Sequence, residues 1–151
     1  MIVEMDYYVY ENVFIEIKKR IDEGLPLVPI SMNISSVHLK EGELMDYINY
    51  LFDKYPIPAK YVEFELTESI YIENLEAALE LINSLRSKGI RISMDDFGSG
   101  YSSLNLLNNL PIDILKLDKI FLNGDDLTAN QKIIISCIIA VSYTHLTLPT
   151  A

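Results

Sequence analysis

Hydrophobic residues recur at helical spacing in five segments of the chain. They predict helices over Tyr7–Asp22, over Glu43–Lys54, between Asn74 and Gly89, over Leu104–Leu110, and from about Thr128 onward. The apolar stripe of the first helix consists of Val9, Val13, Phe14 and Ile17. Asn74 is suited to cap the third helix, and Gly89 is suited to end it in a left-handed conformation.

Four shorter apolar segments predict strands between these helices. They are Leu27–Ile34, Tyr61–Thr67, Ile90–Met94 and Asp113–Leu117. Within the second segment, Val62, Phe64 and Leu66 alternate with Glu63, Glu65 and Thr67, which is the period of a strand. Strands that alternate with helices indicate an α/β fold with a parallel sheet. About four such units are too few to close an eight-stranded barrel.

Composition narrows the class of protein. The 151 residues suit one domain, and the formal net charge of −10 argues against a general binder of DNA or RNA polymers, which needs a basic surface. A small phosphorylated ligand is not excluded, because a bound divalent metal can reverse the local field. Cys137 is the only cysteine, which excludes an intrachain disulfide, and we expect it to be buried. The chain lacks a signal pattern and an apolar run of membrane-spanning length, which predicts a cytoplasmic location and leaves a membrane-anchored parent protein open.

The most informative stretch runs from Ile92 to Ser103. It places Asp95 and Asp96 where an apolar strand gives way to a turn that contains Gly98 and Gly100. Adjacent carboxylates repel each other unless a cation offsets their charge, and they suit a hard divalent metal. A solvated turn is the competing interpretation, because Asp, Gly and Ser are common turn residues.

Polar residues recur near the C-terminal ends of all four predicted strands. They are Asn33, Glu65, the pair Asp95 and Asp96, and Lys116. Because these ends face the same rim in parallel α/β folds, we expect the side chains to converge on one site. Amide and carboxylate oxygens are the ligands that Mg²⁺ and Mn²⁺ prefer. Separate structural roles are the alternative: an edge salt bridge for Glu65, a helix-cap network for Asn33, and neutralisation of Asp118 by Lys116.

The same residues resemble the motifs of the EAL-domain family, the bacterial phosphodiesterases that open cyclic di-GMP. The matching segments are Asn33-Ile-Ser35, Glu65-Leu-Thr-Glu68-Ser69, Asp95-Asp-Phe-Gly-Ser-Gly-Tyr-Ser-Ser-Leu104, Leu110-Pro-Ile-Asp113 and Lys116-Leu-Asp118-Lys-Ile-Phe121. Ser99 stands where the family usually has Thr. The resemblance covers roughly Met5 to Ala140, and it is specific because several elements agree in order and spacing.

The resemblance implies a partial TIM-like (βα) barrel and a role for each residue. Asn33, Glu65, Asp95 and Asp96 would be ligands of a two-metal site that holds Mg²⁺ or Mn²⁺. Lys116 would contact the nucleophilic water or the scissile phosphate, and Glu68 would steady the loop from Phe97 to Ser103. Two such ions can share a bridging hydroxide and balance charge as the phosphodiester oxygen leaves, giving linear pGpG. His38 is expected to be a core or surface histidine rather than a ligand.

The chain also departs from the family pattern. It has no Glu-Ala-Leu signature, whose Glu is a metal ligand in the family, and no later Glu-Gly-Val-Glu element. We therefore expect residues 1–140 to be a partial EAL domain that is inactive alone. The last segment, Val141–Ala151, resembles the translation of a sequencing-library adapter, and we interpret it as a non-native tail without a functional role.

Two other functions are weighed against hydrolysis. A non-catalytic EAL module would act as a cyclic di-GMP receptor or as a protein-interaction domain, and a neutral residue at the missing signature Glu would favour it. A phosphoacceptor receiver domain also uses paired acids and a lysine, but there the acid pair precedes the other site residues, whereas here Asn33 and Glu65 come first. The resemblance leaves open whether the parent dimerises and whether sensory or diguanylate-cyclase domains adjoin it.

Overall fold

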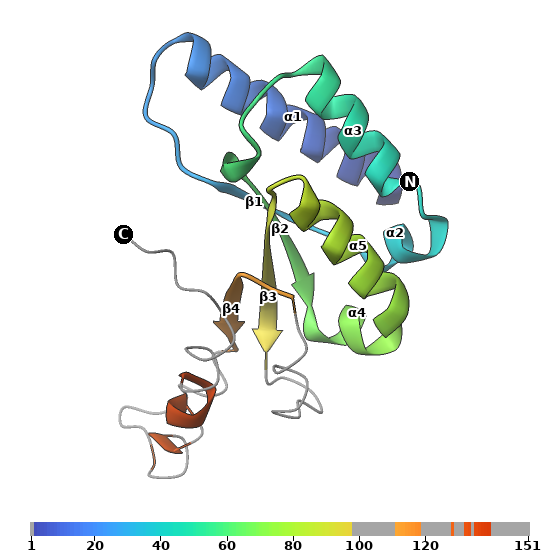
Figure 1. Cartoon of the computed structure of the whole chain (residues 1–151), viewed down its shortest axis with the longest axis vertical. Coiled ribbons are helices and arrows are strands. Elements are labelled where there is room, and N and C mark those ends of the chain that lie inside the picture. Colours follow the sequence, from blue (N-terminus) through green and yellow to red (C-terminus); the bar gives the residue numbers. More distant parts are fainter. Residues whose placement is uncertain (1, 98–110, 119–127, 129–131, 134, 140–151) are drawn as a thin grey trace.

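A parallel four-stranded sheet with helices packed against it forms the centre of the computed structural model (Figure 1). The structure describes residues 2–97, 111–118, 128, 132–133 and 135–139. The strands are β1 (Ile30–Asn33), β2 (Val62–Thr67), β3 (Arg91–Phe97) and β4 (Ile114–Leu117), and they lie side by side in chain order. Each neighbouring pair is parallel, which confirms the predicted α/β fold with four strands.

Helices connect the strands, as expected for βα units. They are α1 (Ile2–Asp22), α2 (Ser36–Glu41), α3 (Leu44–Lys54), the 3₁₀ helix η1 (Ala59–Tyr61), α4 (Glu68–Glu73) and α5 (Leu75–Ser87). Residues 132–133 and 135–139 are also helical, in agreement with the helix predicted after Thr128. The helix predicted over Leu104–Leu110 lies outside the described residues.

Some local predictions differ from the structure. The short helices α2 and α4 were not predicted, because six residues are too few to show a helical period. Asn74 stands before α5 without making a side-chain capping hydrogen bond, whereas Gly89 follows the helix at φ +84° as expected. Cys137 is exposed, so the expectation that it is buried was wrong.

The first helix turns a slightly different face to the core from the one predicted. Phe14 and Ile17 are buried as expected, but Val9 is 46% exposed and Tyr10 takes its place in the interior. A helix period alone does not distinguish these neighbouring positions, since either one continues the stripe. Tyr10 therefore belongs to the core.

The two faces of the sheet differ sharply in polarity. One face packs against the helices and is apolar; it contributes Met32, Phe64, Leu66, Ile92 and Met94, all of them buried. The opposite face carries Ser31 and Asn33 from β1, Glu63 and Glu65 from β2, Arg91, Ser93 and Asp95 from β3, and Lys116 from β4. The interior of a βα barrel is usually filled by bulky branched side chains. The polar face of this sheet departs from that pattern and is therefore the candidate location of a functional site.

An aromatic cluster joins α1 to α2 and α3. The rings of Tyr7 and Tyr47 stack at 3.9 Å between centroids, and His38 stacks on Tyr7 at 5.5 Å. The buried His38 ring places Nε2 2.9 Å from the Asp6 carboxylate. His38 is thus a core histidine, as expected. Within the described ranges, no helix is both long and apolar enough to cross a bilayer.

Candidate functional site

Asn33 and Glu65 lie side by side at the C-terminal ends of two neighbouring strands. The parallel register of β1 and β2 pairs their Cα atoms directly. Paired residues of neighbouring strands point to the same side of a sheet, so both side chains lie on the polar face. Asn33, at the last position of β1, is exposed, while only 11% of the Glu65 side chain is accessible. The predicted convergence of these two residues is therefore present in the backbone register.

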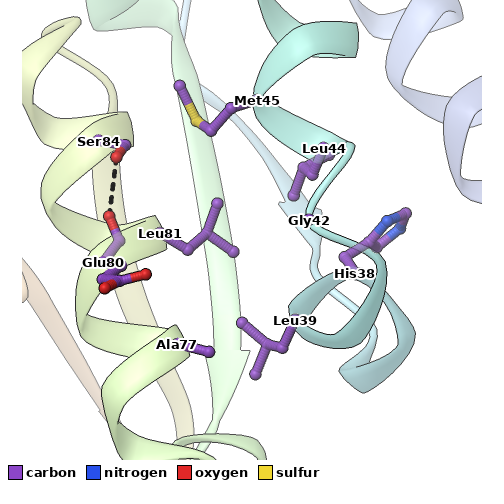
Figure 2. A pocket seen from close by; sticks show the side chains of 9 residues that line it. All are labelled: His38, Leu39, Gly42, Leu44, Met45, Ala77, Glu80, Leu81 and Ser84. Carbon is purple, nitrogen blue, oxygen red and sulfur yellow. Dashed lines mark hydrogen bonds between the residues drawn. The ribbon is translucent and has the colours of Figure 1, made fainter.

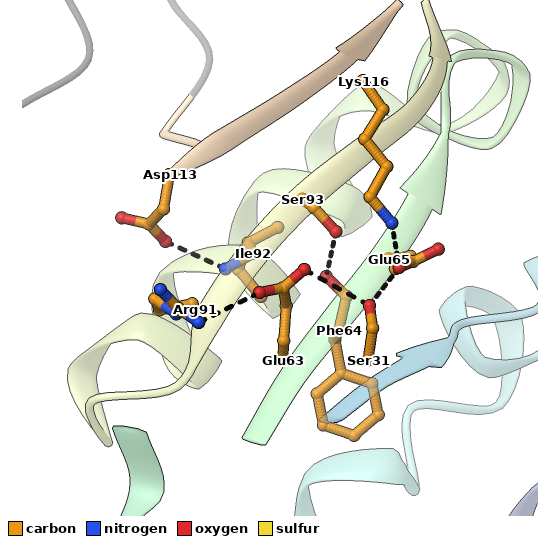
Figure 3. A network of polar contacts seen from close by, with 9 residues as sticks. All are labelled: Ser31, Glu63, Phe64, Glu65, Arg91, Ile92, Ser93, Asp113 and Lys116. Carbon is orange, nitrogen blue, oxygen red and sulfur yellow. Dashed lines mark hydrogen bonds and ion pairs between the residues drawn. The ribbon is translucent and has the colours of Figure 1, made fainter. Parts of the chain in front are cut away.

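Lys116 forms an ion pair with Glu65 that reaches across the intervening strand. Lys116 comes from β4 and Glu65 from β2, with Ser93 of β3 between the two strands (Figure 3). Ser31 donates a second hydrogen bond to the same carboxylate oxygen. The alternative in which Lys116 neutralises Asp118 is not supported by the described contacts, because Lys116 forms its ion pair with Glu65.

These contacts fix the charge of both partners. Burial alone would raise the pKa of Glu65, but the hydrogen bonds from Lys116 and Ser31 outweigh it and lower that pKa. Burial alone would lower the pKa of Lys116, but the hydrogen bond and charge of Glu65, with the charges of Asp95 and Glu63, raise it. At neutral pH the site therefore contains a carboxylate anion and an ammonium cation.

A second layer of polar contacts lies below this pair, toward the N-terminal ends of the strands. Arg91 approaches Glu63 at 3.4 Å, and Ser31 donates to Glu63 at 3.3 Å as well as to Glu65 (Figure 3). Glu63 is buried. Neither Glu63 nor Arg91 was predicted to belong to the site. The alternation of Glu63 with apolar neighbours in the sequence does, however, indicate that Glu63 lies on this face of the sheet.

The two adjacent aspartates occupy a β-bulge. The register between β3 and β4 shifts between Met94 and Phe97, and Asp96 has a φ of +55°. The Asp96 amide donates to the Asp95 carboxylate at 2.9 Å. Asp95 pairs with Thr67 of β2, two residues beyond Glu65. The strand was predicted to end at Met94, but it continues through both aspartates, and the bulge determines where their side chains point.

Glu68 lies next to this region, at the first position of α4. It is 2% exposed and follows β2 directly. The loop that Glu68 was predicted to steady lies mostly outside the described residues, so its role stays a prediction.

The chemistry of the side chains fits a hard divalent cation. Asn33, Glu65, Asp95 and Asp96 offer only oxygen donors, which Mg²⁺ and Mn²⁺ prefer. Over the ranges described, no three His, Cys, Asp or Glu side chains are gathered closely enough to hold a metal, and Glu65 is engaged by Lys116. The ligand assignment therefore stays a prediction that is supported by donor type and strand register.

Comparison with known proteins identifies the family. The family described as EAL domain matches residues 1–145. The chain is 40% identical over 111 residues to signaling protein YkoW of Bacillus subtilis, which covers 74% of this chain and 14% of YkoW. It is 31% identical over 132 residues to cyclic di-GMP phosphodiesterase NbdA of Pseudomonas aeruginosa, and this match covers 87% of the chain and 17% of NbdA. Cyclic di-GMP phosphodiesterase PdeR of Escherichia coli is 32% identical to it over 142 residues, and this match covers 94% of the chain and 21% of PdeR.

The chain thus spans about a fifth or less of the length of these relatives. Among solved structures, the MucR phosphodiesterase in complex with cyclic di-GMP superposes with a TM-score of 0.81 at 28% identity. That superposition covers 95% of this chain and 62% of the MucR chain. The architecture, the strand-end motifs and the match over nearly the whole sequence agree: the chain belongs to the EAL domain family.

Proposed function

We propose that the protein containing this chain hydrolyses one phosphodiester bond of cyclic di-GMP and releases linear pGpG. Membership of the EAL domain family supports the proposal, as does the similarity to two relatives that are named cyclic di-GMP phosphodiesterases. The observation that carries it is the pairing of Asn33 with Glu65 on a polar sheet face where Lys116 reaches the same carboxylate.

The residues of the site have two proposed roles, which are to bind divalent cations and to contact the phosphate. Asn33, Glu65, Asp95 and Asp96 would hold Mg²⁺ or Mn²⁺ through oxygen atoms. The lowered pKa of Glu65 suits that role, because the residue is ionised at neutral pH. Divalent ions so bound supply Lewis acidity and lower the pKa of water. The bulge at Asp95 and Asp96 presents both carboxylates at the end of one strand, which concentrates negative charge there.

Lys116 would act as a fixed positive charge. Its pKa is raised by Glu65, so the ammonium stays protonated at neutral pH and is a poor proton acceptor. It can donate hydrogen bonds to a phosphate oxygen or to the attacking water, and it offsets the anionic side chains around it. A positioned cation of this kind stabilises charge that develops on phosphate oxygens in the transition state.

The test is release of pGpG from cyclic di-GMP by the whole protein, with Mg²⁺ or Mn²⁺ supplied. Asp95→Asn should reduce turnover by about a hundredfold or more, because it replaces an anionic oxygen ligand with a neutral amide. Asp22→Asn is the matched control, because Asp22 is an exposed residue at the end of α1, outside the sheet, where it pairs with Lys18. Equal activity of Asp95→Asn and the wild type would contradict the assignment.

A non-catalytic receptor is the second candidate. The MucR phosphodiesterase, whose structure is similar to this chain, is seen in complex with cyclic di-GMP, and binding of that ligand does not require turnover. Tight binding of cyclic di-GMP by the wild-type protein, with no pGpG released at saturating Mn²⁺, would favour the receptor over the enzyme.

A further inference from the structure

The phenol of Tyr10 is tied to the strand end that carries Asn33. Tyr10 lies on α1, is 1% exposed, and donates a hydrogen bond to the backbone carbonyl of Asn33 at 2.7 Å. Its ring meets Phe64 of β2 edge-on, with centroids 5.2 Å apart and planes at 90°. The His38 ring of α2 lies 5.9 Å away. Contacts from three elements therefore hold the hydroxyl in place.

The Asn33 carbonyl needs a partner that β2 does not supply. The amide of Ile34 donates to the Glu65 carbonyl at 2.9 Å, so it points toward β2. Within one peptide unit the carbonyl and the amide point in opposite directions, and the Asn33 carbonyl consequently points away from β2. The Tyr10 hydroxyl therefore donates to this carbonyl the hydrogen bond that β2 does not supply.

We propose that Tyr10 is a positioning residue for the catalytic site: it anchors the end of β1 so that the Asn33 side chain lies opposite Glu65. This inference rests on the proposed role of Asn33 as a metal ligand. Asn33 is exposed and sits at the last position of its strand, where the backbone is least restrained by sheet pairing. One hydrogen bond from the core is thus well placed to determine its position.

The chain offers a matched control. Tyr47 of α3 is a partly buried tyrosine whose hydroxyl donates to the backbone carbonyl of Tyr7 at 3.1 Å. Tyr10→Phe and Tyr47→Phe each delete one hydroxyl and one hydrogen bond to a carbonyl. Only the first of these carbonyls belongs to a predicted ligand, so a difference between the variants reports positioning rather than general loss of stability.

The experiment measures Mn²⁺ affinity of the whole protein by electron paramagnetic resonance titration in the absence of substrate. Tyr10→Phe should weaken Mn²⁺ binding by about tenfold, the size of effect that outer partners of metal ligands have. Tyr47→Phe should leave Mn²⁺ affinity unchanged. In carbonyl ¹³C spectra without metal, the Asn33 signal should shift in Tyr10→Phe and not in Tyr47→Phe.

Asn33→Ala separates this proposal from the one on which it rests. If Asn33→Ala weakens Mn²⁺ binding while Tyr10→Phe binds like the wild type, positioning by Tyr10 is wrong and the ligand assignment stands. If Asn33→Ala binds Mn²⁺ like the wild type, the ligand assignment fails and the positioning role fails with it. Equal weakening by Tyr10→Phe and Tyr47→Phe would also overturn the proposal, since it would show a general effect of stability.

Discussion

Asp96 has a left-handed backbone conformation next to a second carboxylate. Its φ of +55° is costly for most residues with a β-carbon, and Asp and Asn tolerate it better than others. The repulsion between adjacent carboxylates adds to that cost. Such strain is found where function requires a special geometry, which agrees with the predicted role of Asp96 in holding a cation.

Substitutions at Asp96 should separate stability from activity. Asp96→Asn keeps a side chain that tolerates this conformation and removes the charge repulsion, so the free energy of unfolding should stay equal or rise by up to about 1 kcal/mol. Asp96→Ala should lose about 1 kcal/mol relative to Asn in urea unfolding. Hydrolysis should fall in both variants. An Ala variant as stable as the Asn variant would show that the left-handed conformation is not maintained in solution.

At the scale of elements, Asp113 joins β3, β4 and α5. Its carboxylate accepts a hydrogen bond from the Ile92 amide at 2.9 Å (Figure 3). It accepts another from the Arg86 guanidinium at 3.1 Å. Its own amide donates to the Ile92 carbonyl at 2.8 Å. One side chain therefore fixes the start of β4 against its neighbouring strand and the helix that precedes that strand.

Removal of this carboxylate should destabilise the fold. Asp113→Ala leaves the Ile92 amide without its side-chain acceptor and should cost about 1–3 kcal/mol in urea unfolding. The control is Asp22→Ala, which removes an exposed pair within α1 and should cost less than about 0.5 kcal/mol. Equal losses in the two variants would mean that Asp113 is a surface residue without a structural role.

The helices and strands are also the features that the sequence predicted best. Alternation in Tyr61–Thr67 predicted both faces of β2, because a strand has a period of two, and the parallel sheet followed from the order of elements. The helices α2 and α4 are too short for a period to show. The bulge at Asp95 and Asp96 depends on the register with β4, and the Tyr10 contact depends on packing across 23 residues, so local pattern could predict neither.

Figure 2 shows a pocket on the helical side of the sheet, which is separate from the polar face. It lies between α5 and the segment from α2 to α3, with Leu39, Met45 and Leu81 among its lining side chains and His38 at one side. Glu80 is exposed at its rim, and Ser84 donates to the Glu80 carbonyl. Aliphatic and polar side chains both line this pocket, and none of its lining residues belongs to the charged sheet face.

For the molecule as a whole, the ion pair of Glu65 with Lys116 links stability to pH. The pKa of Glu65 is lowered in the folded protein despite its burial. Its contribution to the free energy of unfolding is therefore present above the pKa of the unfolded carboxyl group and is lost as pH falls through the pKa of the folded one. Lys116 has a raised pKa despite its burial, so its contribution is present below the unfolded ammonium pKa and is lost as pH rises through the folded value. The pair thus stabilises the fold across the neutral range.

Lys116→Met should lower the free energy of unfolding near neutral pH and flatten its fall on acidification. The change is expected to be at most about 1 kcal/mol, because more than a third of the Lys116 side chain is exposed and solvent screens the pair. Lys18→Met, which removes an exposed pair with Asp22, is the control. Urea unfolding as a function of pH checks the prediction, and identical acid profiles for the two variants would contradict it.

The central claim is that the polar sheet face of this EAL domain is a metal-dependent hydrolytic site. It is tested most directly by cyclic di-GMP hydrolysis in the whole protein, measured for the wild type, for Glu65→Gln and for the surface control Glu80→Gln, with EDTA and then with excess Mn²⁺. The wild type and Glu80→Gln should lose activity in EDTA and recover it with Mn²⁺, while Glu65→Gln should stay about a hundredfold or more below them. Hydrolysis that persists in EDTA, or that is unaffected by Glu65→Gln, would contradict the account.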